Sequence, residues 1–226
     1  MDALGQAWVP LALSLKVASL ATLIDLVLGV AVALALARSR SRWRNLIDSL
    51  LTLPLVMPPT VLGYYLLIIF GRRGWLGADL AKIGVSLVFT WQGAVLAAAV
   101  VAFPLVLKAS RAAFEATNHQ LEDAARVLGL SETALFFRVT LPLAAPGVLA
   151  GTLLSFARAM GEFGATLMIA GNLPGRTQTL SVAVYAAVQA GDDALATTLV
   201  IITSITCVVV LMAAGHLLST RTAARP

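Results

Sequence analysis

Five stretches of the chain consist almost entirely of apolar side chains, and short polar segments separate them. A helix needs roughly 20 such residues to cross about 30 Å of hydrocarbon, and each stretch is at least that long. Lipid cannot satisfy open backbone polar groups, and these runs do not alternate as the strands of a membrane barrel do. The pattern therefore predicts an all-α integral membrane protein with five transmembrane helices. Their approximate bounds are Val9–Ala37, Ser49–Phe70, Val85–Leu107, Leu141–Ala170 and Ala194–Ser219.

The composition of the chain agrees with lipid as its surroundings. Of 226 residues, 59% are hydrophobic and only 12% are charged, whereas about 25% of residues are charged in a soluble domain. The formal net charge of +5 does not indicate nucleic acid, because basic residues also orient membrane proteins. We therefore expect a membrane-lipid environment and no nucleic-acid partner.

Basic residues in the polar segments predict the orientation. Ten Lys and Arg residues lie after the first span, after the third span and in the tail, whereas four lie in the remaining segments. The basic side of a membrane protein is usually cytoplasmic, so five spans place the N-terminus outside and the C-terminus in the cytoplasm. This predicts one transmembrane domain over residues 9–219, a cytoplasmic loop over 108–140 and a cytoplasmic tail over 220–226. No basic segment precedes the first span, so we expect no cleavable signal peptide.

The outer loop over residues 172–193 contains a further apolar run, "LSVAVYAAVQA". Its 11 residues are too few to span the bilayer. We expect a short helix that lies on the outer face or dips into it.

One segment of the cytoplasmic loop has the pattern of a soluble amphipathic helix. Its apolar residues recur at intervals of three and four, which places them on one helical face, while the charged residues point elsewhere. A helix this short is marginal by itself, so it either packs on its own membrane or bundle, or binds a groove on a soluble partner. The apolar residues are Leu121, Ala124, Ala125 and Leu128, and the charged ones are Glu122, Asp123 and Arg126.

The residues after this helix predict a break and a second helix. Gly129 suits the position after a helix, where φ is positive, and Ser131 suits the N-cap of the next helix. Pro142 and Pro146 lie where the fourth span begins, and proline is tolerated in the first turn of a helix.

Prolines and charges inside the predicted spans are candidates for a pathway. Pro54, Pro58 and Pro59 lie in the second span and predict either a structural kink or a bend that shapes a passage or hinge. Arg158 and Glu162, four residues apart in the fourth span, should face protein or water. They form either an ion pair that ties helices together or part of a gate.

Other positions inside the spans complete these candidates. Gly161 and Gly164 flank Glu162 and permit close contact or bending. Asp25 lies deep in the first span and is either protonated or partnered. The candidate pathway residues are Arg158, Glu162, Gly161, Gly164, Pro58 and Pro59.

The sequence contains no motif of a hydrolase, a metalloprotease or an ATP-binding P-loop. We therefore expect a transport subunit, not an enzyme, with no metal site and no cofactor of its own. Energy for uphill transport would come from another subunit.

The loop from Asp123 to Pro142 resembles the signature of type I ABC import permeases: Glu-Ala-Ala, three residues, Gly, nine residues, Ile, any residue, Leu-Pro. Aspartate replaces the glutamate here, and Val139 replaces the isoleucine. The segments "LPLVMPPTVLGYYLL", "GRRGWLG" and "SFARAMGEFGATLMIAGNLPG" look like those of molybdate permeases, with sulfate permeases close behind. The residues that match the signature are Asp123, Ala124, Ala125, Gly129, Val139, Leu141 and Pro142.

This resemblance implies the type I ABC importer permease fold in a bacterial inner membrane, with the N-terminus periplasmic. It implies a homodimer, two cytoplasmic subunits that bind ATP and Mg, and a periplasmic molybdate-binding protein. Molybdate would cross by alternating access at the dimer interface; a sulfate or tungstate permease and, less so, an ion-coupled transporter remain alternatives. The residues expected to couple to the ATPase are Leu121, Glu122, Asp123, Ala124, Ala125, Leu128, Gly129, Leu141 and Pro142.

Overall fold

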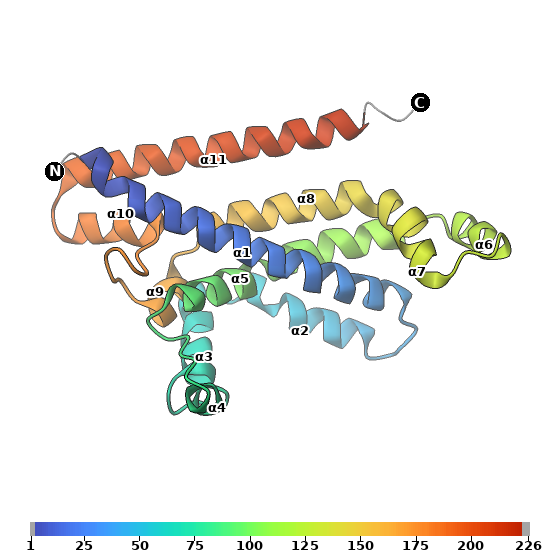
Figure 1. Ribbon diagram of the computed structural model, residues 1–226, viewed down its shortest axis with the longest axis horizontal. Helices are drawn as coiled ribbons and strands as arrows, with labels where there is room; N and C mark the ends of the chain where they lie inside the picture. The colour runs from blue at the N-terminus through green and yellow to red at the C-terminus, as the bar shows by residue number, and fades with distance from the viewer. Residues whose placement is uncertain (1–2, 223–226) are drawn as a thin grey trace.

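The computed structural model describes residues 3–222, which form helices and their connections without a strand. Four helices are long and apolar enough to cross a membrane, and they run lengthwise beside one another (Figure 1). This confirms the all-α prediction. The four are α1 (Ala3–Arg38), α5 (Trp91–Glu115), α8 (Leu141–Met160) and α11 (Asp193–Thr222).

Helices α1, α5 and α8 form the centre of the molecule and pack through small residues. A Cβ added at Gly151 of α8 would lie 2.7 Å from the Cβ of Ala109, and one added at Gly147 would lie 2.6 Å from the Cβ of Ala113. A Cβ added at Gly29 of α1 would likewise lie 3.0 Å from Cγ1 of Val106 in α5. Helices in lipid associate through such close backbone approach, so these glycines set the spacing of the central helices.

The second predicted span is broken where its prolines predicted a kink. It consists of α2 (Arg44–Val56) and α3 (Pro59–Phe70), and the chain turns by 113° between them. Pro58 and Pro59 supply no backbone N–H, which ends α2. The 13 and 12 residues of these helices are each fewer than a straight span needs. Together, however, they carry the chain from the end of the bundle where α1 stops to the end where α5 starts (Figure 1).

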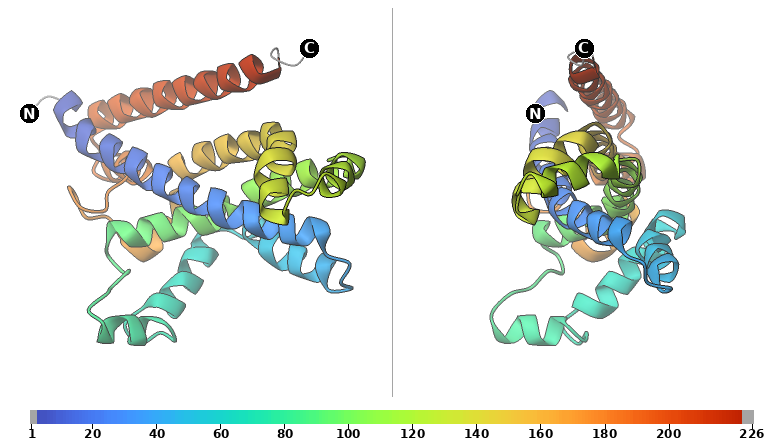
Figure 2. Two further views of the ribbon diagram at one scale, coloured as in Figure 1. Left: turned by 45° about the vertical axis from the view of Figure 1, so that its right-hand side comes forward. Right: turned by 90° about the vertical axis from the view of Figure 1, so that its right-hand side faces the viewer.

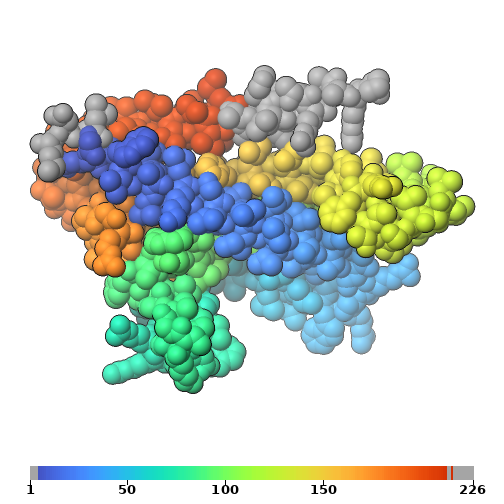
Figure 3. Space-filling view, viewed as in Figure 1, coloured from blue at the N-terminus to red at the C-terminus, as the bar shows by residue number. Residues whose placement is uncertain are grey.

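Helix α3 and the short α4 (Gly77–Lys82) project sideways from the central helices. Figure 2 shows this projection in two further views, and Figure 3 shows that it remains separate on the molecular surface. The following helix, α5, begins at Trp91 and not at the predicted Val85. Thr90 caps it, because its Oγ1 accepts a hydrogen bond from the backbone N of Gly93 at 3.2 Å.

The fourth predicted span is also interrupted. Helix α8 ends at Met160, residues 161–163 break the helix, and α9 (Gly164–Ala170) follows. The short helix predicted within residues 172–193 is confirmed as α10 (Leu180–Gln189), whereas its place on the outer face stays a prediction. Helix α11 continues past the predicted end of the fifth span to Thr222, and residues 223–226 of the predicted tail lie outside the described residues.

Candidate functional site

The loop between α5 and α8 has the order of elements that its sequence predicts. Helix α6 (His119–Val127) begins at Asn118, whose Oδ1 accepts a hydrogen bond from the N of Gln120 at 2.9 Å. It ends before Gly129, where φ is +84°, as a left-handed C-terminal break requires. Ser131 then caps α7 (Glu132–Leu135), because its Oγ accepts from the N of Ala134 at 3.3 Å.

A π-helical turn, η1 (Phe136–Thr140), joins α7 to α8. In an α-helix the ring of Pro142 would clash with the carbonyl of Arg138, four residues earlier. The wider π turn relieves this contact, and such turns are frequent at functional sites. Leu141 packs beside the buried cluster that contains Phe114. Pro142 remains exposed.

The structure leaves most of the apolar face of α6 without a partner in this chain. Leu121 is 48% exposed, Leu128 is 80% exposed and Ala124 is also exposed. Ala125 is the one buried residue of this face, at 8% exposure. Val127, which the sequence analysis did not single out, adds a side chain that is 88% exposed. The face therefore suits a partner outside this chain better than the chain's own bundle.

Glu122 lies beside Ala125 on the buried side of α6 and points into the bundle. Its Oε1 accepts hydrogen bonds from Thr140 Oγ1 at 2.5 Å and from Arg38 Nη2 at 3.1 Å, and the residue is 4% exposed. Burial by itself would raise the pKa of Glu122, but the Thr140 hydrogen bond and the Arg38 charge outweigh it, so the pKa lies below its ordinary value. Its carboxylate is thus held inside this chain, although Glu122 was among the residues expected to couple to the ATPase.

Arg38 is a site residue that sequence reasoning counted only as one of the cytoplasmic charges. It is the last residue of α1, 84 positions before Glu122. No local spacing connects two residues so far apart. Only the pairing of α1 with the loop reveals the contact.

A second ion-pair group lies on the outer side of α6 and ties it to α7. Arg126 donates from Nε to Glu132 Oε1 at 2.7 Å and from Nη1 to Asp123 Oδ1 at 2.8 Å. The hydrogen bond from Arg126 lowers the pKa of Glu132, and the same contact raises the pKa of Arg126. The exposed side chains at this site make a salt-sensitive connection that holds the two short helices as one unit.

The candidate gate residues form an ion pair at the end of α8. Arg158 Nη1 lies 2.8 Å from Glu162 Oε2, and Glu162 Oε1 accepts from the N of Ala165 at 2.8 Å. The Glu162 side chain is 1% exposed, whereas that of Arg158 is 33% exposed. Glu162 thus ties α8 to the start of α9, which supports the structural interpretation of the pair.

The break before α3 (residues 57–58) and the break after α8 (residues 161–163) lie together, and we call them the two helix breaks. A Cβ added at Gly164 would lie 3.0 Å from the Cβ of Pro59. A Cβ added at Gly63 would lie 2.8 Å from the Cα of Ala165. The candidates Pro59 and Gly164 are therefore in contact. A Cβ added at Gly161 would make only ordinary van der Waals contact, 3.9 Å from the carbonyl oxygens of Ala157 and Arg158.

Asp25 has the partner that the sequence could not name. Its Oδ2 accepts a hydrogen bond from Ser155 Oγ at 2.8 Å, which ties α1 to α8. Towards the other end of α1, Ser14 Oγ accepts from the N of Leu180 at 2.8 Å and ties α1 to α10.

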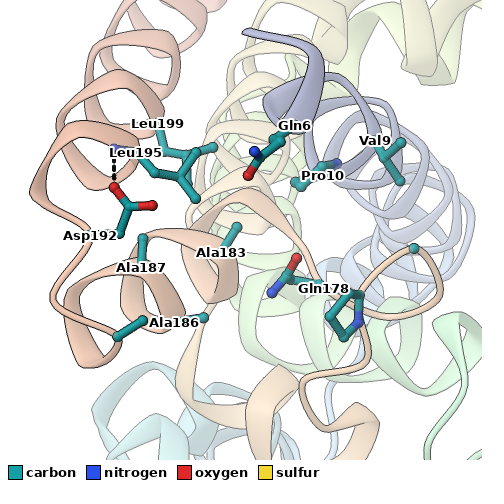
Figure 4. Close-up of a pocket in the computed structure, with 13 residues that line it drawn as sticks. Gln6, Val9, Pro10, Gln178, Ala183, Ala186, Ala187, Asp192, Leu195 and Leu199 are labelled. Carbon is teal, nitrogen blue, oxygen red and sulfur yellow. Dashed lines mark hydrogen bonds between the residues drawn. The ribbon is translucent and has the colours of Figure 1, made fainter. Parts of the chain in front are cut away.

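A cavity of about 380 Å³ lies beside α10, among the first turns of α1 and α11 (Figure 4). Gln6 and Gln178 border it, and Asp192 accepts a hydrogen bond from the N of Leu195 at its edge. Among the residues that line it, the one charged side chain is acidic, which does not suit an anion. Over the described residues, no three His, Cys, Asp or Glu side chains gather as metal ligands, and the expectation of no cofactor stays a prediction.

Comparison with known proteins gives matches over nearly the whole chain. Residues 25–223 match the family described as "Binding-protein-dependent transport system inner membrane component". The molybdenum transport system permease protein of Escherichia coli (strain K12) is 47% identical over 183 residues, which cover 80% of each chain. A putative molybdenum transport system permease protein of Bacillus subtilis (strain 168) is 40% identical, with 85% of each chain covered.

Two further matches are a more distant relative and a solved structure. A probable sulfate transport system permease protein of Prototheca wickerhamii is 32% identical, over 84% of this chain and 77% of its own. The crystal structure of a bacterial ABC transporter involved in the import of alginate superposes with a TM-score of 0.76. It covers 95% of this chain and 79% of that one, at 16% sequence identity.

Proposed function

The chain belongs to the family of binding-protein-dependent transport system inner membrane components, and from this premise we propose that it is the permease subunit of an ATP-driven molybdate importer. The observation that best supports molybdate as the substrate is the 47% identity to a molybdenum permease over 80% of both chains. The sulfate relative is only 32% identical. The exposed apolar face of α6 supports the coupling to a separate motor subunit.

The proposed topology has five spans in a bacterial inner membrane, with the N-terminus periplasmic and the C-terminus cytoplasmic. Helices α1, α5 and α11 run in one direction along the bundle, whereas α8 and the α2–α3 pair return (Figure 1). If the α2–α3 pair counts as one broken span, the number of spans is five. The basic segment 38–44 and the α6 loop then share the cytoplasmic side.

In the proposed complex, the exposed face of α6 docks into a cleft on a cytoplasmic ATPase subunit, one for each of two permease copies. Full burial of Leu121 and Leu128 would contribute about 1.5–3 kcal/mol each. ATP and Mg would be bound by those subunits and not by this chain. Leu141 and Pro142 would transmit the motion of the loop to α8, in which they lie.

Transport is proposed to occur at the interface of a homodimer, because one copy of this fold is small for enclosing a route for a dianion. A periplasmic binding protein would deliver molybdate, and rigid-body motion would expose the route to one side at a time. The two helix breaks are the proposed hinge of that motion. Arg158 is not proposed as a fixed anion site, because Glu162 already neutralises it and a tight site would slow release.

Reconstitution tests this function. The chain, its ATPase partner and the periplasmic binding protein are placed in proteoliposomes, and uptake of labelled molybdate is measured with and without ATP. We expect uptake that requires ATP and the binding protein, with sulfate competing weakly. Stronger uptake of sulfate or tungstate would reassign the substrate, and uptake driven by an ion gradient without ATP would contradict the ABC mechanism.

A further inference from the structure

The contact between the two ends of the loop and α1 is more than a surface ion pair. The Glu122 side chain is 5% exposed, and a buried carboxylate is stable only when it is paired and hydrogen-bonded. Both of the side chains that donate hydrogen bonds to it reach it from outside α6. Arg38 comes from the last turn of α1, and Thr140 from the π turn that leads into α8.

The three side chains form a closed triangle. Arg38 Nη2 lies 3.1 Å from Glu122 Oε1 and 3.4 Å from Thr140 Oγ1, and Thr140 donates to the same Glu122 oxygen at 2.5 Å. Helix α6 is therefore attached to α8 through the chain and to α1 through side chains. Without Arg38, the carboxylate would lose its nearest counter-charge, at 3.1 Å, and would keep only the more distant Arg126 Nη2 at 3.9 Å and His119 Nδ1 at 3.7 Å, both on its own helix. Glu122 would then gain by turning to water.

We propose that Arg38 is a positioning residue of the transport cycle, which makes α1 follow α6 when an ATPase subunit displaces that helix. This inference rests on the proposed function. Helix α1 is suited to carry the motion, because the hydrogen bonds of Asp25 to Ser155 and of Ser14 to Leu180 attach it to α8 and to α10 farther along its length. One helix thus connects the docking end of the molecule to the opposite end (Figure 1).

The test uses the complete complex in proteoliposomes and measures molybdate imported per ATP hydrolysed. Arg38→Gln and Glu122→Gln should each lower this ratio by about fivefold or more, the usual lower range of coupling between sites. The double variant should be no worse than either single one, because both remove the same contact. Arg38→Lys should restore part of the ratio, since it keeps the charge but not the planar fork.

The matched control is Arg40→Gln, which changes an exposed arginine two residues later and should leave the ratio unchanged. An unchanged ratio in Arg38→Gln, or losses that multiply in the double variant, would overturn the inference. If Arg38→Gln does not assemble, the combination Arg38→Lys with Thr140→Val replaces it, with the same fivefold expectation and the same contrary outcome. Absence of ATP-driven molybdate uptake in the wild type would instead overturn the proposed function.

Discussion

At the residue scale, three buried carboxyl groups each join segments that are distant or separately folded. Asp25 joins α1 to α8, Glu122 joins α6 to α1, and Glu162 joins α8 to α9. Each is at most 4% exposed. Buried charges and polar groups are costly unless partnered, so each of these side chains fixes a contact that an apolar residue would not specify.

Replacement of Glu162 separates its two roles. Glu162→Ala should leave the N–H of Ala165 without its acceptor and Arg158 without its counter-charge, and lower stability by about 1–3 kcal/mol. Glu162→Gln keeps an oxygen for the N–H and should cost less. Thermal unfolding of both purified variants in detergent measures the difference. Equal melting temperatures would show that the hydrogen bond to Ala165 contributes nothing.

The lowered pKa of Glu122 predicts a specific pH dependence. Its folded value lies below the ordinary 4.5, so its contribution to stability is fully present above that pH and is lost as the pH falls through the folded value. Glu122→Gln removes this contribution at every pH. The difference in melting temperature between wild type and variant should therefore be constant near pH 7 and shrink below about pH 4.5. A difference that stays constant down to pH 3.5 would contradict the assignment.

At the element scale, the segment from α6 to the start of α8, which we call the lever, has a helix break at Gly129 and is attached to α1 through Glu122. Gly129 provides the break, with φ at +84°, and a Cβ added there would meet nothing within 4 Å. The requirement for glycine is thus conformational and not steric. The anchor is the Glu122 triangle, and the Arg126 group keeps α6 and α7 together.

Gly129→Val should misplace this lever. A β-branched residue in the left-handed region costs about 1–2 kcal/mol, so α6 would adopt another exit angle. We expect ATP hydrolysis that is uncoupled from molybdate uptake. Gly129→Asn is the matched control, because asparagine tolerates the same region, and it should retain most of the uptake. Wild-type uptake by the valine variant would exclude this use of the loop.

Local signals in the sequence predicted much of this lever. Asn118 was not singled out, but the positions of Gly129, Ser131 and the α6 residues specified the helices, because caps and breaks depend on neighbouring residues. The contact of Arg38 with Glu122 and the meeting of the two helix breaks could not be predicted. Both depend on how distant helices pack, and a single sequence does not show this.

At the scale of the whole molecule, the path of the chain depends on the α2–α3 pair. If the pair crosses the membrane, the described ends of the chain lie on opposite sides. If it is a re-entrant loop, they lie on the same side. Length and composition allow four spans or five, whereas the course of the helices along the bundle favours the odd number (Figure 1).

Cysteine labelling decides between these topologies. In a Cys207→Ser background, Ser41→Cys should be labelled only from the cytoplasm and Pro174→Cys only from the periplasm. Both positions are exposed and lie in connections between helices. Labelling of both from the same side would show that α2 and α3 enter and leave through one face. Ala124→Cys, on the exposed face of α6, should be labelled from the cytoplasm.

The π turn η1 explains how two buried residues, one in α7 and one at the end of η1, lie on the same side of the continuous helical segment from α7 to α8. Leu135 is 0% exposed and Thr140 is 1% exposed, although residues five apart in an α-helix point about 140° away from each other. Because a π turn closes on the fifth residue, both can face inward. Rewinding this stretch to ordinary α-helix with all its residues kept would therefore turn Leu135 away from the side of Thr140, toward water, whereas deletion of Arg138 would give an ordinary helix in which both residues still face inward. The π turn thus absorbs one extra residue and keeps the buried sides of α7 and α8 aligned along one continuous helical segment.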